Sequence, residues 1–213
     1  MTTKRLHLIR HGQTDWNRDK RVQGHAESEL TGLGRQQAAR LAPVLRLEPI
    51  TAVHCSSSVR TRQTGEILFR DSALSLSPCD RLREIYLGPW EGRMQAEVRA
   101  TWPDQFEYFW HRPDRFSLAG AETFQQVQQR ALDRIQELLA SPDQHIAVVS
   151  HGVWIKTLLC AIEDRHLGQL WEPPVMHNCA HSIVEVDDSG SMRIVQYAET
   201  ADDETSQPEA TRR

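Results

Sequence analysis

Two apolar segments that each end in a His-Gly pair constrain this sequence most strongly. Leu6–Arg10 runs into His11-Gly12, and Ile146–Val149 is followed, after one serine, by His151-Gly152. Short apolar runs of this kind are typical of strands that are buried on both faces of a parallel sheet. In such sheets, ligands bind beyond the carboxyl ends of the strands. We therefore expect Arg10, His11 and His151 to lie close together at one sheet edge, although they are far apart in the sequence.

The remainder of the chain alternates strands with helices. We predict strands over Leu6–Arg10, Thr51–Cys55, Ala73–Ser77 and Ile146–Val149, helices over Thr31–Leu47, Val59–Arg70 and Glu122–Ala140, and a hairpin formed by Ser182–Val186 and Met192–Tyr197. This alternation indicates an α/β fold with a mostly parallel sheet, to which the hairpin adds an antiparallel edge. We expect one domain over residues 1–198 and, because residues 199–213 are polar and highly charged, a disordered tail there.

Other segments have weaker patterns. Asp15–Leu30 is polar without a clear period and is predicted to be a loop, and Pro43 should kink or split the helix that contains it. The middle segment, Asp80–Ala119, is irregular, with short helices expected over Gly92–Ala100 and Pro103–Trp110. It holds the aromatic residues Tyr86, Trp90, Trp102, Phe106, Tyr108, Phe109 and Trp110. Such a concentration forms either a small satellite core or one wall of a pocket.

The composition excludes several classes of function. A net charge of −4 argues against a general nucleic-acid or membrane-surface binder, which needs a basic face. No apolar run approaches the roughly 20 residues of a membrane-spanning helix, and the first residues show no signal-peptide pattern, so we expect a cytoplasmic protein. The cysteines, Cys55, Cys79, Cys160 and Cys179, are widely spaced without a CxxC pair, which predicts reduced thiols rather than disulfides or a metal site.

The residues around His11 favour phosphoryl chemistry. An imidazole is a competent nucleophile toward phosphorus, and a guanidinium such as that of Arg10 binds phosphoryl oxygens in a bidentate manner. Gly12 lets the backbone turn sharply and lets a ligand approach closely. Arg60 and Arg62 add positive charge to the start of a predicted helix, where backbone amides already favour an anion. Arg60 is the stronger candidate, whereas Arg62 fits a solvated helix position equally well.

Phosphate-ester cleavage also needs a proton donor, and two carboxyl groups compete for this role. An alcohol oxygen leaves phosphorus poorly unless it is protonated. Glu84 lies among apolar residues that could raise the pKa of its carboxyl enough for a proton donor. Glu91 has a similar setting, and the residue pattern alone does not separate the two.

These segments together resemble the histidine phosphatase superfamily, the phosphoglycerate-mutase-like proteins that share an RHG tripeptide. The matching segments are Arg10-His11-Gly12 with Thr14 and Asn17 (RHGxTxxN), Val22-Gln23-Gly24, Leu30-Thr31-Gly32-Leu33-Gly34 (LTxxG), Ser56 to Thr64, Leu82-Arg83-Glu84 and Val149-Ser150-His151-Gly152. They run from residue 6 to about residue 160 in the family's order. The RHG tripeptide alone is a weak signal, but the complete series is specific.

The resemblance implies a three-layer αβα fold and a reaction in which His11 is transiently phosphorylated. Arg10, Arg60 and His151 would hold the phosphoryl group, and the matching position assigns the proton donor to Glu84 rather than Glu91. The further substrate-binding residues that we predict are Asn17, Gln23, Gly24, Arg62 and Gly152, with His25 and His111 as additional candidate contacts. Family members need no metal for this chemistry, so we expect neither a metal nor a cofactor.

The family contains both phosphatases and mutases with the same catalytic core. Mutases typically carry a longer insertion with extra basic residues, whereas Tyr86 to Glu122 is compact and aromatic here. We therefore expect a phosphatase for small phosphomonoesters, similar to the small bacterial broad-specificity members. The alternatives are a phosphoglycerate mutase-type isomerase, a phosphoprotein phosphatase and, least favoured, a non-catalytic module that binds phosphorylated ligands. A homodimer is compatible with the sequence but is not demanded by it.

Overall fold

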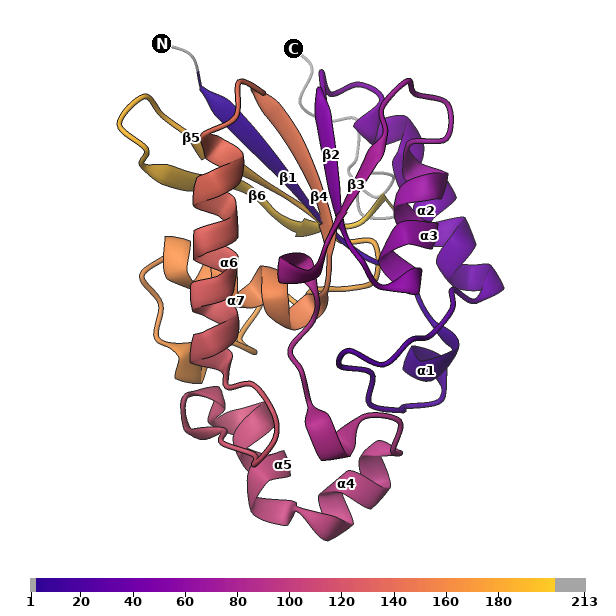
Figure 1. Cartoon of the computed structure of the whole chain (residues 1–213), viewed down its shortest axis with the longest axis vertical. Coiled ribbons are helices and arrows are strands. Elements are labelled where there is room, and N and C mark those ends of the chain that lie inside the picture. The colour runs from indigo at the N-terminus through magenta and orange to yellow at the C-terminus, as the bar shows by residue number, and fades with distance from the viewer. Residues whose placement is uncertain (1–2, 202–213) are drawn as a thin grey trace, which may run out of the picture.

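The computed structural model describes residues 3–201, which contain a six-stranded sheet (Figure 1). The strands are β1 (Lys4–Arg10), β2 (Ala52–Ser56), β3 (Leu76–Cys79), β4 (His145–Ser150), β5 (His181–Val186) and β6 (Met192–Glu199). In the order β3-β2-β4-β1-β5-β6, the first four strands are parallel, and β5 and β6 are antiparallel to their neighbours. The predicted fold, a mostly parallel sheet with an antiparallel edge, is confirmed.

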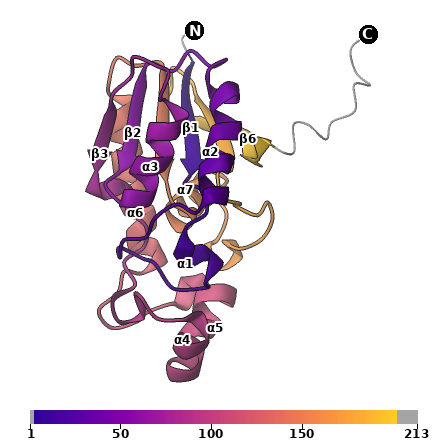
Figure 2. The same cartoon turned by 90° about the vertical axis from the view of Figure 1, so that its right-hand side faces the viewer.

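Helices cover both faces of the sheet and close its lower end (Figures 1 and 2). The α-helices are α1 (Asp15–Arg18), α2 (Gly32–Leu45), α3 (Val59–Leu68), α4 (Gln95–Thr101), α5 (Pro103–His111), α6 (Phe124–Leu139) and α7 (Gly152–Ile162). Four single-turn 3₁₀ helices span Asp80–Leu82, Gly88–Trp90, Pro113–Arg115 and Leu167–Gln169. Within the described part of the chain, no helix is long and apolar enough to cross a membrane.

Alternating side chains of β1 divide the interior into two hydrophobic cores. Leu6 and Leu8 pack into a core with α6 and α7, whereas Ile9 belongs to a second core with α2 and α3. Successive side chains of a strand point to opposite faces, so a fully apolar strand needs cover on both sides. The helix layers supply that cover, and the result is the expected three-layer arrangement.

The structure corrects two predicted segments and narrows a third prediction, that Pro43 kinks or splits its helix, to a kink. A short helix, α1, lies in the segment predicted as a loop, because Thr14 and Asn17 form a capping box at its start. Strand β3 begins and ends later than predicted and includes Pro78, which an edge strand tolerates. Pro43 does not split α2.

Glu199, the first residue of the predicted tail, is the last residue of β6. Residues 202–213 lie outside the described residues, so their predicted disorder and the predicted domain limits stay predictions. All four cysteines are free thiols, as the sequence predicted.

The turn after β1 is fixed by a close backbone approach to α2. A Cβ atom added to Gly12 would lie 2.5 Å from the carbonyl oxygen of Gly34, and one added to Gly34 would lie 2.0 Å from that of Gln13. Thr31 caps α2 and donates its backbone N–H to the same Gln13 oxygen at 2.9 Å. The residues that follow β1 are therefore locked against the first turn of α2.

This close approach predicts that Gly34→Ala destabilises the protein. The added methyl group meets backbone atoms that cannot rotate away, so the free energy of unfolding should fall by about 1–3 kcal/mol. Gly32→Ala is the matched control, because a Cβ atom there meets nothing within 4 Å. Urea unfolding should show a lower midpoint for Gly34→Ala, with an unchanged slope. Equal midpoints for the two variants would contradict the close approach.

Candidate active site

A pocket of about 320 Å³ opens at the carboxyl edge of the parallel strands. Its polar end is lined by Arg10, His11, Asn17, Gln23, Gly24, Arg60, Glu84 and Gly152. Its other lining residues are mostly apolar: Val22, Ile85, Leu87, Trp90, Phe106, Phe109, Trp110, Val153, Trp171, Val175 and Met176, together with the polar Arg21, Gln95 and Lys156. Residues from the ends of β1 and β4 and from the start of α3 thus line one cavity. This is the location expected for a ligand site in a parallel sheet, beyond the carboxyl ends of the strands.

The His11 side chain is held in one tautomer. Its Nδ1 lies 2.8 Å from the carbonyl oxygen of Gly12. Because a carbonyl oxygen can only accept, Nδ1 carries the proton and Nε2 keeps its lone pair. Burial, reinforced by the charges of Arg60 and Arg10, lowers the pKa of His11 well below its usual value of 6.5. The imidazole is therefore neutral at pH 7, with a lone pair on Nε2 in a side chain that lines the pocket.

His151 lies beside His11, with the two ring centroids 5.3 Å apart. Arg60 Nε donates to His151 Nδ1 at 3.2 Å, so the proton of His151 is on Nε2, which donates to the Ser56 hydroxyl at 2.8 Å. Both nitrogens of His151 are thus engaged, and His151 is not among the described residues that line the pocket. In this structure His151 therefore contacts Arg60 and Ser56, and its predicted contact with the phosphoryl group stays a prediction.

Two guanidinium groups supply the positive charge of the pocket's polar end. Arg60 is fully buried, and its terminal nitrogens donate to the carbonyl oxygens of Gly24 at 2.8 Å and Ala26 at 2.9 Å. Burial lowers the pKa of Arg60 to about 10, which still leaves it charged at pH 7. Arg10 donates to the Met176 carbonyl oxygen, and its buried Nε has no hydrogen-bond partner among residues 3–201. The two charges suit a doubly charged phosphoryl group.

The carboxylate of Glu84 is held by backbone N–H groups. Its Oε1 accepts from Ile85 at 3.0 Å and from Trp154 at 3.2 Å, and its Oε2 accepts from Val153 at 3.2 Å. Two of these donors belong to the first turn of α7, where the helix dipole favours negative charge. Glu84 thereby faces the pocket in a fixed orientation.

Glu91 has a structural position instead. Its Oε1 accepts from the backbone N–H groups of His25 at 2.7 Å and Leu87 at 3.0 Å. A Cβ atom on Gly24, whose φ is +54°, would lie 2.1 Å from the same oxygen, so glycine is required there on two counts. Glu91 joins the loop that carries Gly24 to the segment after Glu84, and the described residues that line the pocket do not include it.

Hydrogen bonds fix the remaining polar residues of the pocket. The Gln23 Oε1 accepts from the hydroxyls of Ser28 at 2.7 Å and Thr14 at 3.1 Å, which turns the amide nitrogen of Gln23 toward other partners. Asn17 accepts at Oδ1 from the backbone N–H of Thr14 at 3.2 Å. The side-chain amide of Asn178 lies 3.4 Å from the same oxygen. Two amide side chains are therefore preorganised beside His11.

Three predicted substrate contacts are not brought into the pocket. Arg62 is exposed because it lies two positions after Arg60 on α3, which places it on the opposite side of that helix. His111 is exposed beside Glu107. The His25 ring bonds the backbone oxygen of Glu84 at 2.8 Å and therefore positions the acid segment instead of lining the pocket.

The sequence prediction missed residues from the second half of the chain. Lys156 lines the pocket although it is 2% exposed, and its ammonium donates to the carbonyl oxygens of Glu172 at 2.8 Å and Pro174 at 3.1 Å. Burial lowers its pKa to about 8. A single lysine in the otherwise apolar run of α7 was the signal for it. The segment from Trp171 to Met176 carried no comparable signal.

The aromatic middle segment turns out to be both satellite core and pocket wall. Trp90, Phe109 and Phe116 pack with ring centroids 5.3–5.7 Å apart, which is core packing. Trp90 and Phe109 also line the pocket, as do the less buried Phe106 and Trp110. Tyr108 is not among the described lining residues.

The comparisons with known proteins agree with this geometry. A family model described as the histidine phosphatase superfamily (branch 1) matches residues 6–200. Glucosyl-3-phosphoglycerate phosphatase of Mycolicibacterium vanbaalenii is 33% identical over 170 residues, which are 76% of this chain and 75% of that protein. The probable phosphoglycerate mutase GpmB of Salmonella choleraesuis is 28% identical over 208 residues, 93% of this chain and 92% of that one. The solved structure of Bacillus stearothermophilus YhfR superposes with a TM-score of 0.89 at 38% identity, covering 92% of this chain and 97% of the other. This chain therefore belongs to branch 1 of the histidine phosphatase superfamily.

Proposed function

We propose that this protein hydrolyses small phosphomonoesters through a phosphohistidine on His11. The observation that carries the proposal is the fixed tautomer of His11, which leaves a nucleophilic Nε2 in a pocket that also holds two guanidinium groups. A neutral imidazole attacks phosphorus, whereas a protonated one cannot. The glucosyl-3-phosphoglycerate phosphatase relative is consistent with this reaction class.

In the first step, His11 Nε2 forms a bond to phosphorus while the bond between phosphorus and the ester oxygen breaks. The electron pair of that bond goes to the leaving oxygen, which takes a proton from Glu84. Because the second pKa of a phosphomonoester is about 6, the incoming substrate can itself deliver this proton to the carboxylate. In the second step, Glu84 removes a proton from water, which attacks phosphorus and releases inorganic phosphate and free His11.

The remaining polar residues bind and orient the phosphoryl group. Arg10 and Arg60 neutralise its charge, and the amides of Asn17 and Gln23 donate to its oxygens. Gly24 and Gly152 also line the pocket, where the absence of a side chain leaves room for the ligand. His151 holds Arg60 in place through the bond to its Nδ1.

The apolar end of the pocket selects the alcohol. Its lining of Trp90, Phe106, Phe109 and Trp110 offers mainly flat aromatic surfaces. A substrate with a flat apolar face, such as an aryl ring or one face of a sugar, would pack there. A second phosphoryl group would find few cations, with Arg21 and Lys156 as those that line this part of the described pocket. This charge distribution favours hydrolysis over the mutase alternative, although the GpmB relative keeps that alternative open.

Two further expectations accompany this function. The proposed reaction needs no metal, because Arg10 and Arg60 supply the charge that a cation would otherwise provide. We also propose a reducing compartment such as the cytoplasm, in line with the four free thiols. Association into a homodimer stays a prediction.

The first test is hydrolysis of p-nitrophenyl phosphate in the presence of excess chelator. We expect turnover by the parent protein to survive and His11→Ala to lose at least about 10³-fold in kcat/KM, because the nucleophile is gone. The exposed His111→Ala variant should match the parent and serves as the control. If the parent turned over no monoester at all, the chain would be a binding module rather than an enzyme.

The second test concerns Glu84 as proton donor. Glu84→Gln keeps the shape but cannot give up a proton, so kcat for alkyl phosphates should fall about 10²–10⁴-fold. Activated aryl phosphates should lose much less in the first step, because their oxygen leaves without a proton. A burst of the phenol measured by stopped flow would isolate that step. Equal losses in the first step for both substrate types would exclude this role.

The third test separates pocket wall from core. Trp110→Ala should raise KM for naphthyl phosphate relative to glycerol phosphate by roughly tenfold, since only the former uses the aromatic surface. Tyr108→Ala removes a neighbouring aromatic residue that does not line the pocket, so it should leave the ratio unchanged. If Trp110→Ala and Tyr108→Ala changed the KM ratio equally, Trp110 would not be part of the pocket wall.

A substrate panel that includes 3-phosphoglycerate would test the mutase alternative. It is scored both for the inorganic phosphate released and for the phosphoglycerate isomer formed.

A further inference from the structure

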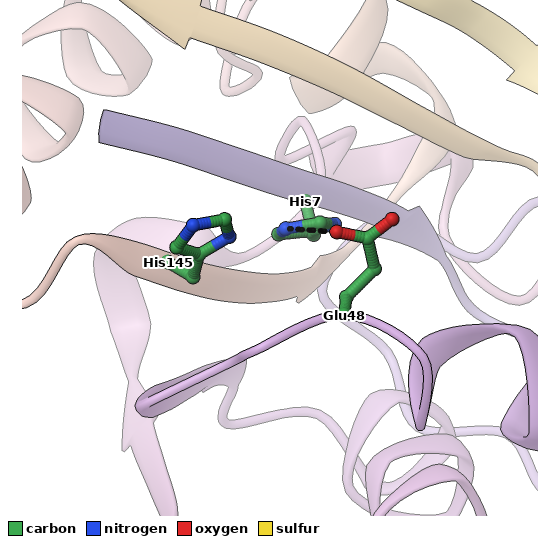
Figure 3. Close-up of side chains that lie close together, drawn as sticks. All are labelled: His7, Glu48 and His145. Carbon is green, nitrogen blue, oxygen red and sulfur yellow. Dashed lines mark ion pairs between the residues drawn. The ribbon is translucent and has the colours of Figure 1, made fainter. Parts of the chain in front are cut away.

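Three imidazoles form a row across the sheet, away from the pocket. His145, His7 and His181 come from the adjacent strands β4, β1 and β5, and their rings stack with centroids 5.8 Å and 5.4 Å apart. They lie on the face of the sheet that α2 and α3 cover. Glu48, from the loop between α2 and β2, points toward His7 (Figure 3). Polar rings on this face interrupt an otherwise apolar core, so they need an explanation.

Two nitrogens of this row have no partner. His7 Nε2 and His145 Nδ1 are buried and make no hydrogen bond to any residue from 3 to 201. The His7 side chain is fully buried. Leaving a buried polar atom unsatisfied costs about 1–3 kcal/mol. One ligand atom each of His7, His145 and Glu48 lie within 4.8 Å of one another. A partner shared by these three side chains would satisfy His7 Nε2, which lies 3.9 Å from Glu48 Oε2.

We propose that His7, His145 and Glu48 bind a divalent transition-metal ion of the Zn²⁺ class. Two imidazole nitrogens and one carboxylate oxygen are a donor set that Zn²⁺ prefers, with water as a fourth ligand. Bond lengths of about 2.0–2.2 Å around a tetrahedral ion place neighbouring ligand atoms about 3.3–3.5 Å apart. His7 Nε2 and Glu48 Oε2 are 3.9 Å apart and the three ligand atoms lie within 4.8 Å of one another, so the partly exposed side chains of Glu48 and His145 must move closer to His7 when an ion binds.

Hydrogen bonds behind His7 hold its ring in place. His7 Nδ1 lies 3.2 Å from His181 Nε2, and the amide nitrogen of Gln196 lies 3.3 Å from His181 Nδ1 and donates to the His181 carbonyl oxygen at 3.2 Å. A metal bound at His7 Nε2 requires the proton of His7 to be on Nδ1, from which it is donated to His181 Nε2.

The surrounding charge is nearly balanced. Arg5 Nη1 lies 3.8 Å from Glu48 Oε2, which on its own would oppose a cation. Arg5 is, however, paired with Glu185 through two hydrogen bonds of 2.8 Å and 3.2 Å. The carboxylate of Glu48 therefore remains available to the ion.

The position of the site indicates a structural role. Three residues of β1, or about 10 Å, separate His7 from Arg10 at the catalytic pocket. The ion would join the loop after α2 to two central strands, segments that are distant in sequence. Binding to the folded chain alone raises its stability by mass action. The proposed catalysis does not depend on this ion.

The proposal is tested on tag-free, chelator-stripped protein. Isothermal titration with Zn²⁺ and Co²⁺ should show one ion per chain, with a rise in unfolding temperature and, for Co²⁺, the visible absorption of a four-coordinate site. His145→Ala and Glu48→Gln should each weaken binding by roughly tenfold or more. Both residues are partly exposed, so these variants should fold, which p-nitrophenyl phosphate turnover will verify. His111→Ala is the control and should bind as the parent does.

The same measurements can overturn the proposal. If the parent binds no ion, or if either His145→Ala or Glu48→Gln keeps the parent affinity, the three residues do not form a metal site and water satisfies the buried nitrogens. Phosphatase activity in chelator is a separate readout. Its loss would count against metal-free catalysis at His11, whereas the fate of the metal site is decided by binding and unfolding temperature alone.

Discussion

The site depends on a single buried interaction, the hydrogen bond from Arg60 Nε to His151 Nδ1. A fully buried guanidinium is costly without hydrogen-bond partners, and each nitrogen of Arg60 has one: His151 and the carbonyl oxygens of Gly24 and Ala26. The two N–H groups that these bonds leave over are free, within the described residues, for a phosphoryl group. The same bonds bring together β4, α3 and the loop after α1. Its charge, together with that of Arg10, helps to keep His11 neutral. One interaction thus links the fold, the position of the cation and the reactivity of the nucleophile.

Hydrogen bonds also determine the roles of the two carboxylates near the pocket, Glu84 and Glu91. Glu84 takes its orientation from the first turn of α7, the helix that begins directly after His151. Glu91, the rival acid candidate, instead joins the Gly24 loop to the segment after Glu84. The two carboxylates have different roles because one accepts hydrogen bonds at the pocket and the other accepts them between loops.

Sequence periodicity predicted the sheet, its two helix layers and the meeting of His11 with the His151 segment. These features follow from local rules: apolar strands need cover on both faces, and parallel strands share a carboxyl edge. What the sequence could not predict depends on rotation and on distant loops. Arg62 was predicted to contact the substrate but is exposed, because two positions along a helix reverse the direction of a side chain relative to Arg60. The segment from Trp171 to Met176 has no sequence pattern that would mark it as part of the pocket. It is held there by contacts with a distant helix, such as the hydrogen bonds from Lys156 to Glu172 and Pro174.

In the proposed reaction, phosphorus undergoes two displacements: His11 replaces the ester oxygen, and the oxygen of water then replaces His11. Each in-line displacement inverts the configuration at phosphorus. Hydrolysis of a phosphorothioate monoester that is made chiral by sulfur and two oxygen isotopes, carried out in water of the third oxygen isotope, therefore distinguishes one displacement from two. The account predicts net retention in the inorganic thiophosphate released. Net inversion would mean that water attacks the substrate directly and would contradict the phosphohistidine on His11.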